Sequence, residues 1–230
     1  MTQDEAKRLV AKRAVEFVED GMAVGLGTGS TSRMFIEELG AKVKASGIKI
    51  RCVASSDASK ALGESLGLEV VSLAELPELD VYIDGADEVA RDADGSLALI
   101  KGGGGALLRE KIVASSAKKF IVVVDSSKVV AKLGKFPLPI EVIKMALPLV
   151  EGKLTELGLN PKQRKAKDGS VYLTDENNYI LDCSVGVIEN PEETAAEVRG
   201  IVGVVEHGLF LGMAAMALVA GDDGVTEMQG

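Results

Sequence analysis

The feature that most constrains this chain is a run of four consecutive glycines, residues 102–105, in the segment KGGGGALLREK. Four glycines in succession are costly in backbone entropy, so we expect a fold that keeps them to require the absence of side chains at these positions. One use is a loop whose bare N–H groups face a ligand oxyanion at the start of a helix. Lys101 would add a positive charge, and Glu110, about one and a half turns into the predicted helix, is a candidate base. A flexible surface loop before a solvated helix is the alternative, and the run taken alone favours it.

Composition narrows the class of protein. The chain has 230 residues, 47% of them hydrophobic, which is enough for one large α/β domain or two smaller ones. The net charge of −9 argues against a nucleic-acid partner, and an anionic substrate would need a local positive site. Aromatic residues make up only 3% and there is no Trp, so stacking platforms for bases are not expected.

The cysteines, the histidine and the apolar segments limit location and cofactors. Cys52 and Cys183 stand in no metal-binding spacing, which predicts reduced, buried thiols in a cytoplasmic protein. His207 is the only histidine, which excludes a histidine metal cluster. We expect no signal peptide, because the charged N-terminus lacks an apolar core. The most apolar segment, residues 209–220, is too short to span a bilayer, so no membrane partner is expected.

The first part of the chain alternates apolar runs with loops and helical patterns. A capping box, Thr2 to Glu5, opens a predicted helix, and Asp57 is expected to cap another. This alternation predicts an α/β fold with a Rossmann-like open, mostly parallel sheet and helices on both faces. Strands are predicted at residues 22–26, 48–54, 68–73, 80–83, 97–100 and 120–124, and helices at 3–19, around 34–39, 58–66 and 106–115.

A proline-marked boundary at residues 134–139 precedes a change of pattern. The order that follows, βαββαβ, predicts a smaller ferredoxin-like α+β domain. We therefore expect a Rossmann-like catalytic domain of residues 1–134 and 207–230, and a small domain of residues 135–206. Its predicted elements are a strand at 140–143, a helix at 145–157, a short strand at 163–166, a hairpin of 171–174 with 179–183, a helix at 191–198 that starts at a proline, and a strand at 201–205.

The loop GLGTGST follows the first predicted strand. It is not a dinucleotide fingerprint, because Ser30 stands where the third glycine would fall and no acidic residue closes the second strand. It is not a P-loop either, because no GK[ST] follows. We interpret it as a short phosphate cradle of loop N–H groups, with Gly29 among them, and the hydroxyls of Thr28, Ser30 and Thr31. A tight turn that needs glycines is the alternative.

The segment DGADE places Asp84, Asp87 and Glu88 within five residues at a strand end. Like charges so close are unfavourable unless they are paired or used. A Mg²⁺ site and a helix N-cap with first-turn acids are two interpretations, and binding of sugar hydroxyls or proton transfer is the third. The segment DSSK adds Lys128, which would meet a phosphate or remain solvated.

The common position of these four segments carries the prediction of a site. GTGST, DGADE, KGGGG and DSSK each follow the carboxyl end of a predicted strand. If the strands are parallel, all four loops converge on the crevice where open α/β sheets bind ligands. Four unrelated surface loops would have no reason to share that position.

Taken together, GLGTGST, DGADE, KGGGGALLREK and DSSKVVAKLGKFPLPIEV resemble the A type of ribose-5-phosphate isomerase over most of the chain. The resemblance implies an aldose–ketose isomerase that interconverts D-ribose 5-phosphate and D-ribulose 5-phosphate through an enediolate, without a metal and without a cofactor. It implies that Glu110 moves the proton, that Lys101 stands beside the oxyanion, and that Asp84 and Asp87 hold hydroxyls and assist ring opening. It also implies a homodimer or homotetramer and substrate or phosphate contacts from Thr28, Gly29, Ser30, Thr31, Gly85, Ala86, Gly102, Gly103, Gly104 and Lys128.

One residue departs from the family pattern, and two other classes of protein carry similar loops. The pattern has three glycines and then alanine, so Gly105 is an extra glycine that we expect at the start of the helix. There it would loosen the helix by up to about 1 kcal/mol relative to alanine. A sugar-phosphate sensor would bind without turnover, but no DNA-binding helix-turn-helix is visible. A CoA transferase would form a glutamyl thioester that hydroxylamine traps.

Overall fold

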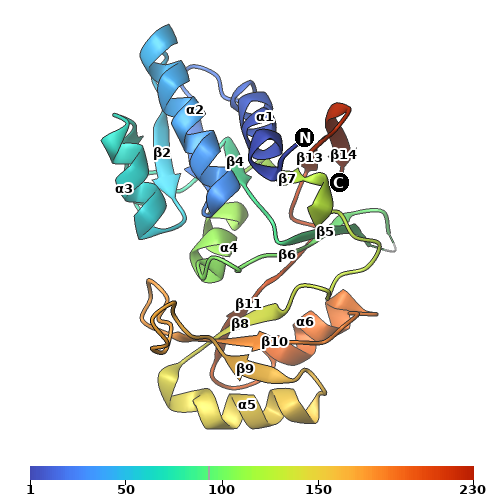
Figure 1. Ribbon diagram of the computed structural model, residues 1–230. Coiled ribbons are helices and arrows are strands. Elements are labelled where there is room, and N and C mark those ends of the chain that lie inside the picture. The colour runs from blue at the N-terminus through green and yellow to red at the C-terminus, as the bar shows by residue number, and fades with distance from the viewer. Residues whose placement is uncertain (93) are drawn as a thin grey trace.

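The computed structural model describes residues 1–92 and 94–230, which form three sheets and the helices that cover them (Figure 1). The largest sheet has seven strands in the order β14-β13-β7-β4-β1-β2-β3. Its strands pair in parallel, except that β14 is antiparallel to β13. The predicted open, mostly parallel sheet is therefore confirmed. Its strands are β1 (Ala23–Leu26), β2 (Arg51–Ala54), β3 (Glu69–Val70), β4 (Val81–Asp84), β7 (Phe120–Asp125), β13 (Met216–Gly221) and β14 (Gly224–Gln229).

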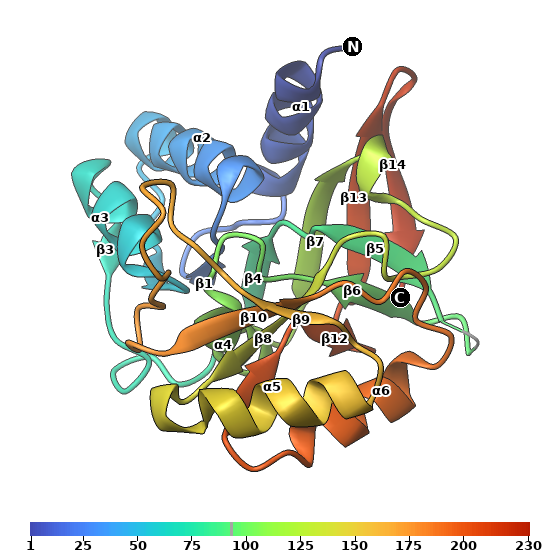
Figure 2. The ribbon, with the colours of Figure 1, turned by 60° about the horizontal axis from the view of Figure 1, so that its bottom comes forward.

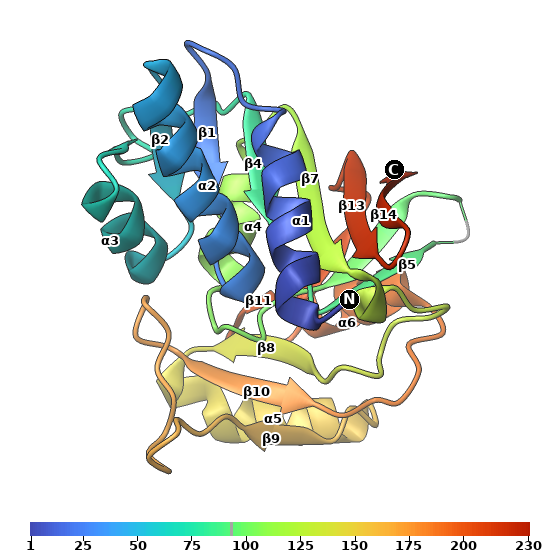
Figure 3. The same cartoon turned by 45° about the horizontal axis from the view of Figure 1, so that its top comes forward.

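Side chains alternate between the two faces of this sheet, as strand geometry requires. In β4, Val81 and Ile83 pack under α1 (Gln3–Val15) and α2 (Ser30–Ser46), whereas Tyr82 faces the opposite core. The opposite face is covered by α4 (Leu107–Ser115) and by a second sheet. Figure 3 shows α1 and α2 side by side over the near face, with α4 behind the strands. The helix α3 (Asp57–Ser65) packs beside α2 at the edge formed by β2 and β3.

The second sheet has three antiparallel strands in the order β12-β6-β5: β12 (Leu209–Leu211), β6 (Leu97–Ile100) and β5 (Glu88–Arg91). Of the three interpretations of DGADE, the helix N-cap is wrong, because the segment leads into β5. The condition that all four preceding strands are parallel is not met either, because β6 lies outside the parallel sheet. The four loops still converge, because antiparallel pairing sets the start of β5 beside the end of β6. The Asp87 N–H donates to the Ile100 carbonyl oxygen at 2.8 Å.

The third sheet has the strand order β11-β8-β10-β9 and is antiparallel throughout. Along the chain the order is βαββαβ, as predicted for a ferredoxin-like unit. Figure 2 shows the helices α5 and α6 side by side below this sheet. The elements are β8 (Leu138–Val142), a 3₁₀ turn (Lys144–Ala146), α5 (Leu147–Glu156), β9 (Pro161–Gln163), β10 (Tyr179–Cys183), α6 (Pro191–Arg199) and β11 (Val204–His207).

Several predicted boundaries differ from the structure. The hairpin of residues 171–174 with 179–183 is wrong, because β10 pairs instead with β8 and β9, and Val171 makes a single bridge to Lys165. The cap of α3 is Ser56 and not Asp57, while the capping box of Thr2 and Glu5 is present. The residues at 92–96, DADGS, are typical of a polar turn, and position 93 of this segment lies outside the described residues. None of the described helices is long and apolar enough to cross a membrane.

We propose the division into residues 1–134 with 207–230 and residues 135–206 on the basis of these sheets. β8, β9, β10 and β11 make up the antiparallel sheet and enclose a core with α5 and α6. Ile100 and Leu209 of the three-stranded sheet also belong to that core, so apolar packing continues across the proposed boundary.

Candidate active site

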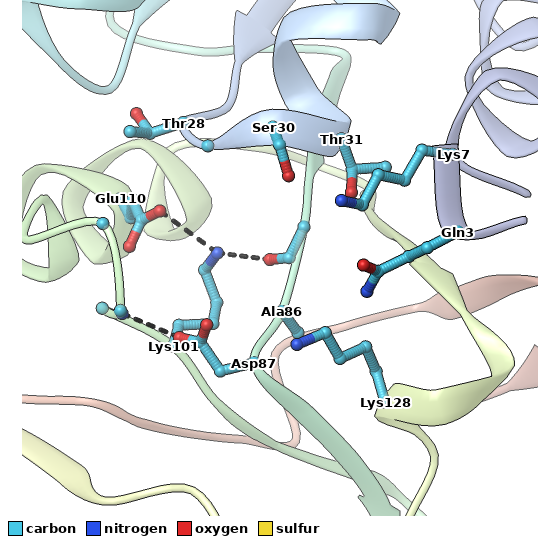
Figure 4. A pocket seen from close by; sticks show the side chains of 15 residues that line it. Gln3, Lys7, Thr28, Ser30, Thr31, Ala86, Asp87, Lys101, Glu110 and Lys128 are labelled. Atoms are coloured by element: carbon cyan, nitrogen blue, oxygen red, sulfur yellow. Dashed lines mark hydrogen bonds and ion pairs between the residues drawn. The ribbon is translucent and has the colours of Figure 1, made fainter. Parts of the chain in front are cut away.

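The loops that follow β1, β4 and β6 line one pocket, together with the turn after β7 and the start of α1 (Figure 4). The structure therefore brings together the four segments singled out in the sequence. Nearly every predicted site residue is in the lining, and Asp84 lies beneath it. The lining residues are Gln3, Lys7, Thr28, Gly29, Ser30, Thr31, Gly85, Ala86, Asp87, Lys101, Gly102, Gly103, Gly104, Glu110 and Lys128.

Lys101 is a buried ammonium held between two carboxylates. Its Nζ donates to Asp84 Oδ2 at 2.7 Å and to Glu110 Oε1 at 3.3 Å. Burial by itself would lower the pKa of Lys101, but the Asp84 and Glu110 carboxylates outweigh this and hold the pKa above its ordinary value. The lysine is therefore charged at neutral pH, and the charge faces the pocket.

Asp84 has no free acceptor position on the pocket side. Its Oδ1 accepts from the Thr28 N–H at 2.8 Å and from the Ser32 hydroxyl at 2.7 Å, and Oδ2 accepts from Lys101 and from the Tyr82 hydroxyl. The side chain is fully buried. These contacts fix the end of β4 and the first loop around the lysine, so Asp84 acts on the pocket through Lys101.

Glu110 lies in the first turn of α4 and is only 4% exposed. Its Oε1 meets Lys101, and among the described residues its Oε2 is a buried oxygen that accepts no hydrogen bond. Burial, opposed by the Lys101 ammonium and assisted by the Asp84 carboxylate, raises the pKa of Glu110 to about 8. A carboxylate with a free oxygen and a pKa near neutrality has the properties of a general base.

The three acids of DGADE point to different places. Asp87 lines the pocket and accepts from the Gly103 N–H at 2.8 Å (Figure 4). Glu88 accepts from the N–H groups of Gly134 and Phe136 at 2.8 and 2.6 Å. Because these two and Asp84 are each paired with different groups, they do not form a metal site, and no cluster of three such ligands occurs among the described residues.

The other end of the pocket gathers hydroxyls and cations (Figure 4). Ser30 and Thr31 open α2, where the first N–H groups of a helix have no partner within it. Thr28 differs from them, because its hydroxyl is bound to those of Ser55 and Ser56 at 2.8 and 2.9 Å. Lys128 follows β7 in a short 3₁₀ turn and reaches the same end of the pocket.

Sequence reasoning missed Gln3 and Lys7. Both lie on α1, one helical turn apart, and both face the pocket beside Lys128 (Figure 4). Gln3 is fixed by a hydrogen bond of 3.2 Å to Asp125 at the end of β7. The i, i+4 spacing gave a weak signal of a shared face. Which loop that face would meet depends on how α1 packs across β7, and no local pattern encodes that.

His207 lies outside the pocket, in a second buried cluster. The Lys111 ammonium donates to Glu206 Oε1 at 2.7 Å and to the His207 carbonyl oxygen at 2.6 Å. Burial and the neighbouring Lys111 ammonium together lower the pKa of His207 to about 4. The histidine is therefore neutral, and this cluster joins α4 to β11. The free thiols of Cys52 and Cys183 are also buried, with pKa values raised to about 12 by burial.

Comparison with known proteins identifies the family. The sequence model described as ribose 5-phosphate isomerase A (phosphoriboisomerase A) matches residues 51–224. The chain belongs to this family. It is 48% identical to the ribose-5-phosphate isomerase A of Levilactobacillus brevis over 224 residues, which cover 97% of this chain and 96% of the relative. The enzyme of that name from Brucella suis is also 48% identical, over 98% of each chain.

Solved structures of the family share the whole fold. The ribose 5-phosphate isomerase A of Methanocaldococcus jannaschii superposes with a TM-score of 0.94 at 39% identity, covering 100% of both chains. A D-ribose-5-phosphate isomerase in complex with phospho-erythronic acid superposes with a TM-score of 0.95 at 37% identity, again over 100% of both chains. The likeness therefore extends over both the parallel sheet and the ferredoxin-like unit.

Proposed function

We infer that this protein interconverts D-ribose 5-phosphate and D-ribulose 5-phosphate by metal-free proton transfer through an enediolate. Membership of the family supports the reaction. A relative that binds phospho-erythronic acid supports a sugar phosphate as the ligand. The roles of individual residues follow from the geometry of the pocket.

The observation that carries the proposal is the free oxygen of Glu110. Oε2 is buried and unpartnered among the described residues, while Oε1 is held by Lys101. We assign Oε2 to remove the proton from C2 of the open-chain aldose and to return it to C1. The electrons left at C2 form the C1–C2 double bond of the enediolate, and the carbonyl oxygen at C1 becomes an oxyanion. A second proton moves from the C2 hydroxyl to the C1 oxygen, so that C2 becomes the carbonyl carbon of the ketose and C1 carries the hydroxyl.

The oxyanion needs fixed partners of positive character. Lys101 supplies a buried charge that Asp84 holds in place at 2.7 Å. The glycine run supplies backbone N–H groups, with Gly104 open to the pocket because only the Thr28 methyl lies within 4 Å of the position that a side chain would take. We assign Asp87, rather than the enclosed Asp84, to hold a sugar hydroxyl and to assist ring opening.

The phosphate belongs at the cationic end of the pocket. There the start of α2 at Ser30 and Thr31 lies near Lys7 and Lys128. Helix N-terminal N–H groups and lysines both bind phosphate oxygens. The loop and the lysines therefore bind the phosphate together, and they supply the local positive site that a chain of net charge −9 requires.

We propose that the protein is a cytoplasmic homodimer or homotetramer. The buried, unpaired cysteines support a reducing compartment. Exposed apolar side chains on the ferredoxin-like unit support self-association, with Met145 94% and Val202 80% exposed. Light scattering across a concentration series measures the mass.

The decisive experiment is a coupled assay for ribulose 5-phosphate formed from ribose 5-phosphate. We expect turnover by the purified protein, unchanged after treatment with a chelator. Ligand binding without turnover would identify a sensor. A large loss of activity with chelator, restored by a divalent cation, would contradict the metal-free mechanism.

A further inference from the structure

The ferredoxin-like unit contacts the glycine run through the backbone carbonyl groups of the run. Arg164, one residue after β9, donates from Nη1 to the carbonyl oxygens of Gly102 at 2.8 Å and Gly103 at 3.3 Å. The hydroxyl of Tyr172 donates to the Gly104 carbonyl oxygen at 3.2 Å. Three successive carbonyls of the loop are thus bound by two side chains from a distant part of the sequence.

These two side chains form a unit with Asp182. The Arg164 guanidinium is bound through Nε at 2.8 Å and through Nη2 by the two carboxylate oxygens of Asp182 on β10. Arg164 Cζ lies 5.7 Å from the centre of the Tyr172 ring, and the Tyr172 N–H donates to the Arg164 carbonyl oxygen at 3.1 Å. A bidentate pair leaves the guanidinium little freedom, so its remaining donors point in a fixed direction.

The geometry of the peptide bond means that these contacts to the carbonyl groups also fix the direction of the N–H groups in the glycine run. In a trans peptide the carbonyl and the following N–H point in opposite directions, and the described chain contains no cis peptide. The Gly102 carbonyl points to Arg164, and the Gly103 N–H points the other way, to Asp87 Oδ2. The Gly103 carbonyl also points to Arg164. The Gly104 N–H is therefore directed away from Arg164, and no described residue accepts from it. Gly104 itself lines the pocket.

The position of Tyr172 requires a glycine at residue 105. Its φ of +84° lies in the left-handed region, and a Cβ there would be 2.1 Å from the Tyr172 hydroxyl. Gly105 also precedes α4 and its N-cap, Ala106, so the expected loosening of the helix does not apply. The extra glycine, which departs from the family pattern, instead makes room for the tyrosine that binds the run.

We propose that Arg164 and Tyr172 are positioning residues for the isomerisation: they set the peptide planes of the glycine run so that the Gly104 N–H faces the enediolate oxygens. This inference rests on the proposed role of the glycine run. It assigns the ferredoxin-like unit a part in catalysis, because the unit orients a loop of the active site without touching the substrate.

The test compares Arg164→Gln, Arg164→Lys and Tyr172→Phe with Lys162→Gln, which removes a charge from an exposed neighbour on β9. We expect kcat to fall about 10–100-fold in Arg164→Gln, since small misplacements of catalytic groups carry losses of that order. A smaller loss is expected in Tyr172→Phe, partial recovery in Arg164→Lys, and none in Lys162→Gln.

Calorimetry separates positioning from a loss of folded protein. Phospho-erythronic acid carries a carboxylate where the enediolate would form, whereas inorganic phosphate probes only the cationic end. In Arg164→Gln we expect about one site per chain, affinity for phospho-erythronic acid at least about tenfold weaker, and affinity for phosphate within about twofold. Wild-type kcat and affinity in both Arg164→Gln and Tyr172→Phe overturn the proposal. So does a drop in stoichiometry that accounts for the whole loss of kcat.

A fourth variant distinguishes this proposal from the one on which it rests. Gly104→Ala adds a methyl group that enters the pocket without a clash, since its nearest neighbour is the Thr28 methyl at 3.8 Å. Full activity in Gly104→Ala would contradict the role of the glycine run itself. Loss of activity in Gly104→Ala, with wild-type behaviour of the Arg164 and Tyr172 variants, would contradict only the positioning role.

Discussion

The Lys101 ammonium lies 3.3 Å from Glu110 Oε1 and leaves Glu110 Oε2 without a hydrogen bond among the described residues. One oxygen is thus fixed while the other is available. The pairing keeps the carboxylate in one orientation, and burial keeps its pKa high enough for it to accept a proton. In the proposed mechanism Glu110 accepts the proton and Lys101 stabilises the negative charge.

Glu110→Gln tests the base directly. The amide keeps the size of the side chain but cannot accept the proton, so we expect kcat to fall roughly 10²–10⁴-fold with the fold retained. Steady-state rates and circular dichroism measure the two effects. Glu197→Gln, at an exposed position of α6, is the matched control. Near-normal turnover by Glu110→Gln would remove this residue from the role of base.

The pH dependence of kcat/KM should report the same carboxyl group in the free enzyme. Glu110 acts in its ionised form, and its pKa is raised to about 8. We therefore expect kcat/KM to rise about tenfold per pH unit below that value and to level off above it. Rates between pH 6.5 and 9.5 at constant ionic strength measure the profile. A flat profile across this range would show that the group titrates near its ordinary pKa.

Much of the site could be predicted from local sequence because strand ends and helix starts are local features. GTGST, DGADE and DSSK follow β1, β4 and β7 of the parallel sheet, so their convergence follows from the topology alone. KGGGG reaches the same place by another route, the antiparallel pairing of β6 with β5. The sequence does not predict the strand β5, because the acids of DGADE extend to its first residue, Glu88. Its carboxylate is instead buried against backbone N–H groups.

The remainder depended on contacts between distant segments. Lys7 reaches the pocket because α1 packs across β7 and β13, and Arg164 reaches the glycine run because the ferredoxin-like unit returns to it. The sequence pattern does not distinguish Asp84 from Asp87. In the structure Asp84 is buried and accepts from five hydrogen-bond donors, whereas Asp87 lines the pocket. Burial separates their roles, and burial is set by the whole fold.

Asp84→Asn should therefore lower mainly the stability of the protein, whereas Asp87→Asn should lower mainly its activity. Removing the Asp84 charge breaks a buried ion pair with Lys101, and we expect the free energy of unfolding to fall by about 3–5 kcal/mol. Asp87→Asn keeps an oxygen for the Gly103 N–H, so we expect a change within about 1 kcal/mol but a fall in kcat/KM of at least about tenfold. Urea unfolding and steady-state rates measure both. Wild-type stability of Asp84→Asn would contradict the enclosed ion pair.

Lys7→Met and Lys128→Met test the cationic end of the pocket. A hydrogen bond to a charged group contributes about 1.5–3 kcal/mol, so we expect KM for ribose 5-phosphate to rise about 10–150-fold in each variant. The phosphate is bound equally before and during proton transfer, so kcat should stay within about threefold. Inhibition by inorganic phosphate should weaken in parallel. Lys12→Met, at an exposed position of the same helix, is the control. An unchanged KM in Lys7→Met, with a raised KM in Lys128→Met, would show that α2 and Lys128 bind the phosphate without Lys7.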